Sequence, residues 1–555
     1  MAAAQVNRND VVIDEIMADP SPARGLPEVE FIEIINVSAK PVNLNGWKIT
    51  DATATASITI NFILQPDSLV ILCTTAARAS LSAFGTTLGI AGFPSLDNDG
   101  EVLSLRANNG KLVHAAAYQK GWYANSLKSE GGWTLEMIDP RNACSGATNW
   151  KASTAEKGGT PGKKNSVDQI NKDELTPVLL HSYAADSLSL VIVFDEPLDS
   201  AAATLSEKYL VSDGIGIPRK VVAITPLFTQ VILYLTAPLQ KGKLYTVSAK
   251  AISDCSGNTM RQYDPVKTGL PAAADTGDVV VNEVLFNPKP DGVDYIELYN
   301  RGKNGVDLKE LWIANRTANN TIANLHRLSA ETRLLFPGEY LVATENPLAV
   351  QRQYPVKNPA AFTEISLPSY PDDKGTIVLL NGSGKIIDEL HYDEKWQFKL
   401  IDNREGVALE RIDYNKPTQN AANWHSASTT TGYGTPTYRN SQFRTDLQLE
   451  GAFTIDPPVF SPDNDGRQDF TTVSYRLAEP GWVCNISLFN IQGIAVRLLV
   501  RNAICGTTGY FRWDGLDERG NKLPSGTYIM LIDVFNLRGK TKRSKLAITL
   551  ARKLS

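Results

Sequence analysis

The chain has 555 residues, of which 43% are hydrophobic and 21% charged, and its formal net charge is -5. This composition is typical of folded globular domains, and at about 150 residues per domain the length predicts roughly four of them. A chain with net negative charge offers no general basic surface to a phosphate backbone, so nucleic acid is not expected as a partner. No apolar run approaches the roughly 18 residues that a membrane-spanning helix needs.

The first five residues indicate whether the protein is exported. Residues 1–5 read Met-Ala-Ala-Ala-Gln and lack the basic and apolar regions of a signal peptide. Small residues at this place are interpreted as the start of a mature chain whose signal peptide has been replaced by a start methionine. We therefore expect a secreted protein or one on the outer cell surface.

The sequence contains an internal repeat that opens at residue 11. Four segments recur in the same order, and the offset between the copies changes by only a few residues along their length. They are VVIDEIMADP (11–20) with VVVNEVLFNP (279–288), EFIEIIN (30–36) with DYIELYN (294–300), LEMID (135–139) with LERID (409–413), and GTPGKKNS (159–166) with GTPTYRNS (434–441). This pattern indicates a tandem duplication with another segment inserted between the copies.

Each copy has the sequence pattern of β-structure. Short runs rich in Val, Ile and Tyr alternate with polar residues, as in strands with one buried face. Asp99-Gly100 and Asn381-Gly382 favour hairpin turns, because Asp, Asn and Gly tolerate positive φ at low cost. The pattern leaves room for one short helix in each copy, near residues 74–84 and 346–354.

These recurring segments resemble the lamin tail domain as it occurs in bacterial secreted proteins. The motifs that carry the resemblance are NEV…NP, DYIELYN, DLKELWI, GTIVLLNGSGKIIDELHY and the closing NW…GTP…NS. The resemblance covers roughly residues 10–166 and 277–442. It implies a compact immunoglobulin-like β-sandwich that is not itself catalytic.

The segment between the copies reads as a further sandwich. Residues 188–198 (LSLVIVFDEPL), 231–236 (VILYLT) and 254–258 (DCSGN) are similar to the bacterial immunoglobulin-like domains of surface-layer and adhesin proteins. That similarity implies a module that keeps the neighbouring domains apart and stiffens the chain. Pro177 and Pro271 stand near its two ends, where a fixed φ limits hinge freedom.

The last part of the chain changes in character at about residue 453. The segments FSPDNDG (460–466), FRWDG (511–515) and LPSGTY (523–528) resemble the immunoglobulin-like domain named after the flagellar hook-capping protein. Similar domains close exported proteins of the Bacteroidetes, where such sandwiches can serve as type IX secretion signals.

The predicted fold class is therefore all-β, with tandem immunoglobulin-like β-sandwich domains. The expected ranges are a first lamin tail domain at 1–170, a bacterial immunoglobulin-like domain at 171–275, a second lamin tail domain at 276–445 and a hook-capping-type domain at 446–555.

Five cysteines are present, and no CxxC pair or Cys/His cluster predicts a zinc site. In an oxidising compartment, pairing within one domain favours Cys73 with Cys144 and Cys484 with Cys505, which leaves Cys255 over. The alternative is that all five are reduced and buried as small apolar side chains.

Acidic residues recur at equivalent places in the two copies. The pairs are Glu15 with Glu283, Glu33 with Glu297 and Glu136 with Glu410. Inward carboxylates could hydrolyse glycosides or bind calcium. The favoured interpretation is structural: each carboxylate accepts backbone hydrogen bonds that tie loops to the sandwich, since a buried charge persists only when it is satisfied.

The five histidines stand in no recognisable nucleophile or metal motif, so a structural role is expected for each. A weak calcium candidate lies in the C-terminal part, where Asp463, Asp465 and Asp469 echo the start of an oxygen-rich calcium loop but lack a distal glutamate. Calcium is the only cofactor considered.

Aromatic residues at loop positions give a last candidate site. Trp122, Tyr123 and Trp396 could form a platform that stacks on sugars, or they could cover an end of the sandwich. The chain as a whole is expected to be a non-catalytic extracellular or cell-surface structural protein with protein or glycan partners. A carbohydrate-binding accessory protein and, third, a secreted hydrolase are the alternatives.

Overall fold

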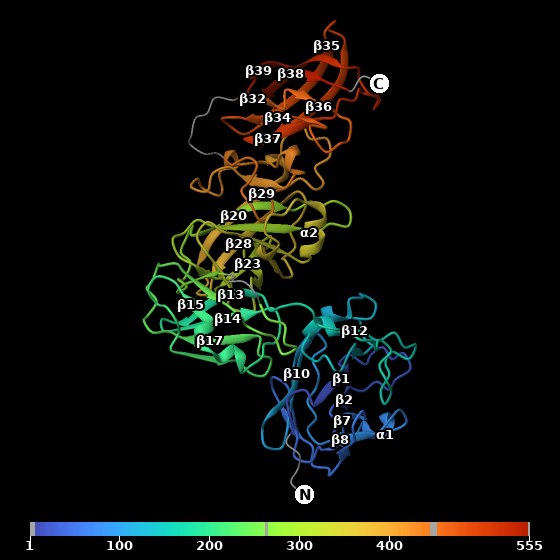
Figure 1. Cartoon of the computed structure of the whole chain (residues 1–555). Helices are drawn as coiled ribbons and strands as arrows, with labels where there is room; N and C mark the ends of the chain where they lie inside the picture. Colours follow the sequence, from blue (N-terminus) through green and yellow to red (C-terminus); the bar gives the residue numbers. More distant parts are fainter. Residues whose placement is uncertain (1–5, 261–264, 444–451, 553–555) are drawn as a thin grey trace. The chain divides into compact units, whose positions relative to one another are not determined.

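The computed structural model describes residues 6–260, 265–443 and 452–552, and its regular structure is almost entirely β-strand (Figure 1). The chain divides into two compact units, residues 1–240 with 244–269 and residues 241–243 with 270–555. The predicted all-β class of tandem β-sandwiches is confirmed. The predicted boundary at residue 445 and the interpreted N-terminus at residues 1–5 lie outside the described residues.

The first unit begins with a sandwich of two main sheets around one apolar core. The six-stranded sheet has the order β12 (Trp150–Ala152), β11 (Leu135–Met137), β1 (Val11–Met17), β2 (Phe31–Asn36), β7 (Leu69–Thr74) and β8 (Thr87–Ile90). The facing sheet has the order β10 (Leu112–Gln119), β9 (Gly100–Arg106), β4 (Lys48–Thr50) and β5 (Thr55–Ser57), and β3 (Val42–Asn43) pairs with β6 (Ile63–Leu64).

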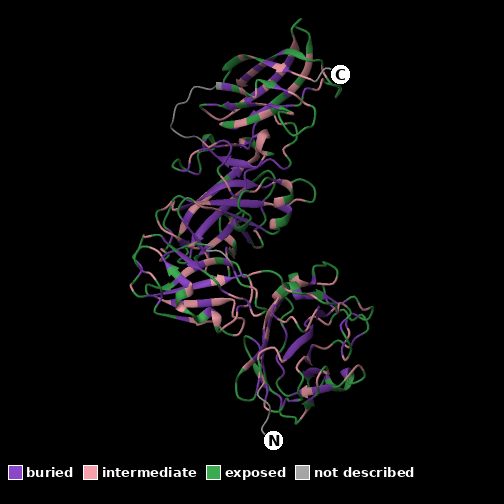
Figure 2. Cartoon of the chain, viewed as in Figure 1, coloured by how far each residue is buried: buried purple, intermediate pink, exposed green. Residues whose placement is uncertain are grey.

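The six-stranded sheet is covered on both faces. Ile32, Ile34 and Leu72 face the sandwich core, while Phe31 and Ile71 belong to a second apolar cluster that includes Leu81 of α1 (Arg78–Leu81). All seven residues of β1 are buried for this reason, and Figure 2 shows this strand in the buried colour. A polar residue on the outer face of this sheet is therefore cut off from water.

A second sandwich completes the first unit. One sheet has the order β13 (Leu179–Asp186), β14 (Ser189–Phe194), β17 (Gln230–Tyr234) and β16 (Lys220–Ala223). The other has the order β15 (Tyr209–Val211), β18 (Tyr245–Ala249) and β19 (Val266–Thr268).

The second unit opens with a sandwich that repeats the topology of the first. Its six-stranded sheet has the order β31 (Trp424–Ser426), β30 (Leu409–Arg411), β20 (Val279–Leu285), β21 (Tyr295–Asn300), β26 (Tyr340–Thr344) and β27 (Phe362–Glu364). The facing sheet has the order β24 (Ile322–Arg327), β23 (Leu311–Arg316), β28 (Lys374–Asn381) and β29 (Ile386–Asp393), and β22 (Val306–Asp307) pairs with β25 (Leu334–Leu335). The helix α2 (Pro347–Gln353) takes the place of α1, so both short helices lie where the sequence predicts them.

The duplication extends to fine details of backbone pairing. In both copies the first strand pairs with the second through a register shift, between Ile13 and Glu15 in one copy and between Val281 and Glu283 in the other. In both copies the strand before the short helix pairs in parallel with the strand after it.

The C-terminal part of the second unit is a further sandwich around its own core. Its smaller sheet has the order β32 (Ala452–Asp456), β34 (Thr471–Arg476) and β37 (Thr508–Trp513). The larger sheet has the order β33 (Val459–Phe460), β39 (Thr541–Leu550), β38 (Gly526–Asn536), β35 (Trp482–Asn490) and β36 (Ala495–Cys505).

Candidate functional site

The repeated glutamates of the first copy lie in a row across three neighbouring strands. Glu15 on β1 pairs directly with Glu33 on β2 and with Glu136 on β11. Directly paired residues point to the same face of a sheet, so the three carboxylates share the outer face. All three residues are 0% exposed.

The closing segment of the first copy, residues 153–168, holds these carboxylates. The backbone N–H of Thr160 donates to Glu15 at 2.7 Å, and its hydroxyl donates to Glu136 at 2.8 Å. The N–H of Gly162 donates to Glu33 at 2.5 Å. The glutamates thus fasten an irregular segment to the sheet, which is the structural role expected from the sequence.

The second copy repeats this arrangement. Thr435 donates its N–H to Glu283 at 2.9 Å and its hydroxyl to Glu410 at 2.9 Å, and the N–H of Thr437 donates to Glu297. Two further donors are present here: the hydroxyl of Tyr295 donates to Glu283, and the side-chain amide of Asn282 donates to Glu297 at 2.6 Å.

The first copy lacks both of these extra donors, although the hydroxyl of Thr134 donates to Glu15 at 2.7 Å there, where the second copy has Ala408. Phe31 stands at the position of Tyr295, and Asp14 stands at the position of Asn282. Oε2 of Glu15, Oε1 of Glu33 and Oδ1 of Asp14 are buried and accept no hydrogen bond. The first copy therefore has a phenyl ring where the second has the Tyr295 hydroxyl, and a fourth carboxyl group where the second has the Asn282 amide.

Burial without a compensating cation favours the protonated form of these groups. Burial, reinforced by the neighbouring carboxylates, raises the pKa of Asp14 to about 8, that of Glu15 to about 8 and that of Glu33 to about 9. In the second copy burial likewise raises the pKa of Glu297. Because the carboxyls are sealed under the closing segments, the arrangement fixes a loop and presents no carboxylate to a substrate.

One histidine of the first copy has a clear structural partner. His114 is 2% exposed, and its Nδ1 accepts a hydrogen bond from the N–H of Ile13 at 3.1 Å. At the equivalent place in the second copy, Asp388 accepts from the N–H of Val281 at 2.8 Å. Burial lowers the pKa of His114 to about 3, so it remains a neutral acceptor.

The cysteine pairing predicted from the sequence is wrong for Cys144. Cys144 is bonded to Cys255, the residue expected to be left over. Cys73 is a buried free thiol near the end of β7, whereas Cys144 lies in a loop that reaches the second sandwich. Cys484 and Cys505 are also free and buried in the structure, although their side chains lie within hydrogen-bonding contact of each other.

The aromatic residues predicted as a sugar platform belong to different sandwiches, Trp122 and Tyr123 to the first copy and Trp396 to the second, and each is partly or fully buried. Tyr123 is 6% exposed, and its hydroxyl donates to the carbonyl of Trp133 at 3.1 Å. Trp122 is half-buried with its ring centroid 5.9 Å from that of Trp150. Trp396 packs against the core of the second copy.

The C-terminal aspartates do come together. Asp463, Asp465 and Asp469 each place a carboxylate oxygen within 4.8 Å of the other two. Both oxygens of Asp469 accept backbone N–H groups of the same loop, from Asn464 at 2.7 Å and Gly466 at 3.0 Å. The loop is largely exposed, and these hydrogen bonds fix its backbone around Asp469.

A second group of three carboxylates was not predicted from the sequence. Asp173, Glu196 and Asp254 also lie within 4.8 Å of one another. They come from separate segments of the first unit, and only Asp254 stands in a recognisable turn motif, DCSGN. No local spacing could have found them together.

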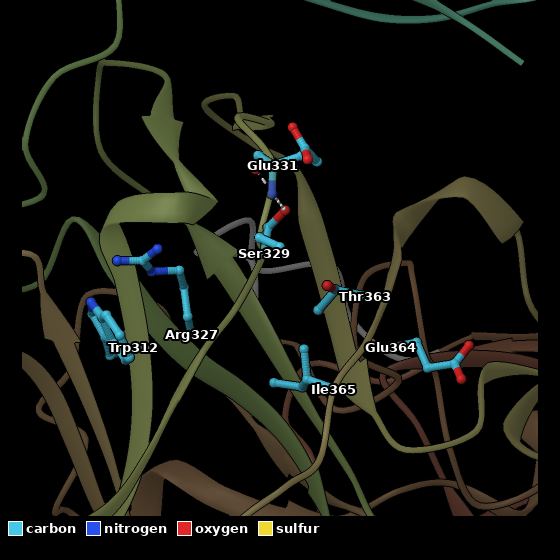
Figure 3. A pocket seen from close by; sticks show the side chains of 8 residues that line it. Trp312, Arg327, Ser329, Glu331, Thr363, Glu364 and Ile365 are labelled. Carbon is cyan, nitrogen blue, oxygen red and sulfur yellow. Dashed lines mark hydrogen bonds between the residues drawn. The ribbon is translucent and has the colours of Figure 1, made fainter. Parts of the chain in front are cut away.

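The surface of the second copy carries a hollow of about 520 Å³ (Figure 3). Trp312 on β23 and Arg327 on β24 lie side by side on one wall, with the Arg327 guanidinium 4.6 Å from the Trp312 ring centre. Thr363 and Ile365 lie on the opposite side of the view. The guanidinium covers one face of the indole, which leaves less of the ring for a ligand.

Within the described residues, no helix is both long and apolar enough to cross a membrane. Residues 4–120 and 272–394 match the family model described as Lamin Tail Domain. No curated protein matches the sequence.

Solved structures with matches include bacterial surface proteins. The N-terminal part of the bacterial S-layer protein SbsC is 19% identical and covers 30% of this chain and 40% of that one, with a TM-score of 0.17. Domains 1–6 of SbsC are 12% identical and cover 69% and 55%, with a TM-score of 0.17. A Ca²⁺-stabilized adhesin of an Antarctic bacterium is 9% identical and covers 99% and 100%, with a TM-score of 0.12. This chain spans about half the length of the S-layer protein or less, and TM-scores this low carry no argument about function.

Proposed function

We propose that this protein is a non-catalytic structural and interaction protein of the extracellular space or cell surface, built from rigid β-sandwich modules. The main support is that the repeated glutamates are buried and hold the closing segments of the two copies. These are the groups best suited to acid–base chemistry, and each row is buried and bound to a closing segment. Their chemistry therefore maintains the fold.

Binding in such a protein is expected on the loops, since a stable scaffold can present variable loops without changing its core. Protein or glycan partners at a cell surface fit this arrangement. A direct test is to treat intact producing cells with a protease and to follow the full chain with an antibody. Loss of the full chain from intact cells, while a cytoplasmic marker survives, is the expected result. Full protection until the cells are lysed would contradict a surface location.

Affinity capture from the native cell envelope tests the interaction part of the proposal. The tagged full chain is expected to recover the same envelope component after mild cross-linking in independent preparations. Recovery of the chain alone, in the soluble fraction, would speak against an assembly role.

The proposal also gives separate roles to the middle sandwich and to the C-terminal residues. The middle sandwich acts as a spacer of the bacterial immunoglobulin-like type, and residues 446–555, of the hook-capping type, direct type IX export. Deleting residues 446–555 in a Bacteroidetes host is expected to leave the remaining chain inside the outer membrane. Unchanged export of the shortened chain would contradict the sorting role.

A carbohydrate-binding accessory role is the second candidate, and the hollow beside Trp312 is the observation that favours it. Glycan arrays with the full chain and with Trp312→Ala separate the two functions. Loss of a glycan signal in this variant, with retention in Leu348→Ala, an exposed residue of α2 that does not line the hollow, would support sugar binding. Hydrolase assays on nucleic acids, esters and glycosides with the same preparations test the third alternative.

A further inference from the structure

Three carboxylates converge where the chain leaves the first sandwich and enters the second. Asp173 lies in the connecting segment, Glu196 follows β14, and Asp254 follows β18. One carboxylate oxygen of each lies within 4.8 Å of the other two. Asp254 is 1% exposed, so the cluster reaches into the protein and is not a solvated acidic surface.

Two of these residues carry a buried oxygen that accepts no hydrogen bond: Oδ2 of Asp173 and Oε1 of Glu196. Among the described residues, no Lys, Arg or His forms an ion pair with any of the three carboxylates. Burial, with the charges of Asp173, Asp254 and Asp195, raises the pKa of Glu196 to about 8. A buried carboxylate oxygen needs a compensating charge or a donor, and among the described residues Oδ2 of Asp173 and Oε1 of Glu196 have neither.

The backbone around the cluster is fixed before any ligand arrives. Asn258 donates its N–H and its side-chain amide to the two oxygens of Asp254, both at 2.8 Å. The same amide donates to the carbonyl of Asp173 at 3.1 Å. The next residue, Cys255, is bonded to Cys144. The converging oxygens therefore belong to a framework that is held in place by other contacts.

We propose that Asp173, Glu196 and Asp254 form a calcium-binding site. Their donors are all carboxylate oxygens, which hard cations prefer. The three oxygens all lie within 4.8 Å of one another, which is close enough for one ion with Ca–O distances of about 2.3–2.6 Å to contact all of them. Magnesium usually keeps several waters and binds through only one or two carboxylates, so three protein carboxylates favour calcium. Water completes the coordination.

Calcium at this place would join the connecting segment to two loops of the second sandwich. It would supply the positive charge that the buried oxygens lack and would limit movement in the connection. This inference rests on the carboxylate geometry and does not depend on the proposed surface function.

The test uses the full chain, stripped of metal with a chelator, and compares it with Glu196→Gln. Calcium binding is measured by titration calorimetry, and stability is measured by thermal unfolding with and without millimolar calcium. Calcium is expected to raise the unfolding temperature of the unsubstituted chain. Glu196→Gln is expected to bind calcium at this site at least tenfold more weakly. Without calcium it should unfold at a temperature equal to or above that of the unsubstituted chain, because like-charge repulsion is removed.

Two further variants keep the test decisive. Asp173→Asn should reproduce the loss, whereas Asp465→Asn, in the exposed C-terminal loop, should retain the calcium response. Absence of calcium binding at millimolar concentration would overturn the proposal. A response that survives both Glu196→Gln and Asp173→Asn but disappears in Asp465→Asn would also overturn it and assign the ion to the C-terminal loop.

Discussion

Phe31 and Tyr295 occupy equivalent positions in the two copies and differ by one hydroxyl. In the second copy that hydroxyl donates to Glu283, while in the first copy Oε2 of Glu15 accepts no hydrogen bond. Phe31→Tyr is therefore expected to raise the free energy of unfolding of the first unit by about 1 kcal/mol. Chemical denaturation of the full chain, followed at the transition of the first unit, measures the change.

The matched control is Tyr295→Phe in the second copy. It removes the donor from a fully buried carboxyl group and should cost about 1–3 kcal/mol. If Phe31→Tyr gives no gain while Tyr295→Phe costs stability, the copies are not equivalent at this position and the account of the unsatisfied oxygen fails.

Asp14 and Asn282 provide a second comparison between the copies. The side-chain amide of Asn282 donates to Glu297 at 2.6 Å. Asp14 has no amide to donate and instead adds a fourth carboxyl group beside Glu33. Asp14→Asn is expected to stabilise the first unit, and more so at pH 9 than at pH 6, because it removes one of the interacting acids. Denaturation at the two pH values measures this, and an equal effect at both would contradict the electrostatic explanation.

The closing segment is the element that gives the glutamate row its function. A Cβ added at Gly159 would lie 2.7 Å from Oε1 of Glu15 and 2.8 Å from Leu26, so this residue permits the close approach of the segment to the sheet. Gly159→Ala should destabilise the first unit by about 1–3 kcal/mol. Gly121→Ala, where an added Cβ meets nothing within 4 Å, is the control and should change the unfolding temperature little.

The buried row also makes the stability of this sheet dependent on pH. In the folded state the pKa values of Glu15 and Glu33 rise to about 8 and about 9, above the usual value of a glutamate in the unfolded chain, so the folded state binds protons more tightly. Their contribution is complete below the unfolded pKa and is lost as the pH rises towards the folded values. The free energy of unfolding of the first unit should therefore fall between about pH 5 and pH 9, by at most about 1.4 kcal/mol per pH unit for each carboxyl group that ionises.

Glu33→Gln is the variant that checks this pH effect, since an amide cannot ionise. Its unfolding free energy, measured by denaturant titration, should decline less steeply with rising pH than that of the unsubstituted chain. Parallel pH profiles for the two proteins would mean that Glu33 does not contribute.

At the scale of the whole molecule, the Cys144–Cys255 bond closes a loop across a sequence separation of 111 residues. A cross-link over so long a loop restricts the unfolded chain, and its removal typically costs about 2–5 kcal/mol. Cys255→Ser should lower the unfolding temperature of the first unit, and intact mass with and without reductant should report one bond. A chain whose mass does not change on reduction would contradict the pairing.

Much of the fold could be predicted from the sequence because its signals are local. Strand alternation, hairpin turns and the repeated segments each depend on residues close together in the chain, and these correctly indicated the all-β class, the two similar copies and their short helices. The same reasoning identified Glu15, Glu33 and Glu136 as carboxylates that hold loops, since an acid among apolar strand residues must be satisfied.

The cysteine partners and the second carboxylate cluster could not be predicted in this way. Pairing within one domain is a sound default for nearby cysteines, but Cys73 is enclosed in a sheet while Cys144 lies in a loop next to Cys255. The aromatic platform stays a prediction: position in a loop says little about burial, and Tyr123 is almost fully buried.

The sequence by itself determined that the chain builds duplicated β-sandwiches with inward carboxylates, because periodicity and internal repeats are written in consecutive residues. Only the tertiary structure decided which groups from distant segments meet: Cys144 with Cys255, Asp173 with Glu196 and Asp254, and each closing segment with its row of glutamates. The reason is physical, since such contacts depend on how strands pair and loops return across the sheet, and local sequence does not specify those distances.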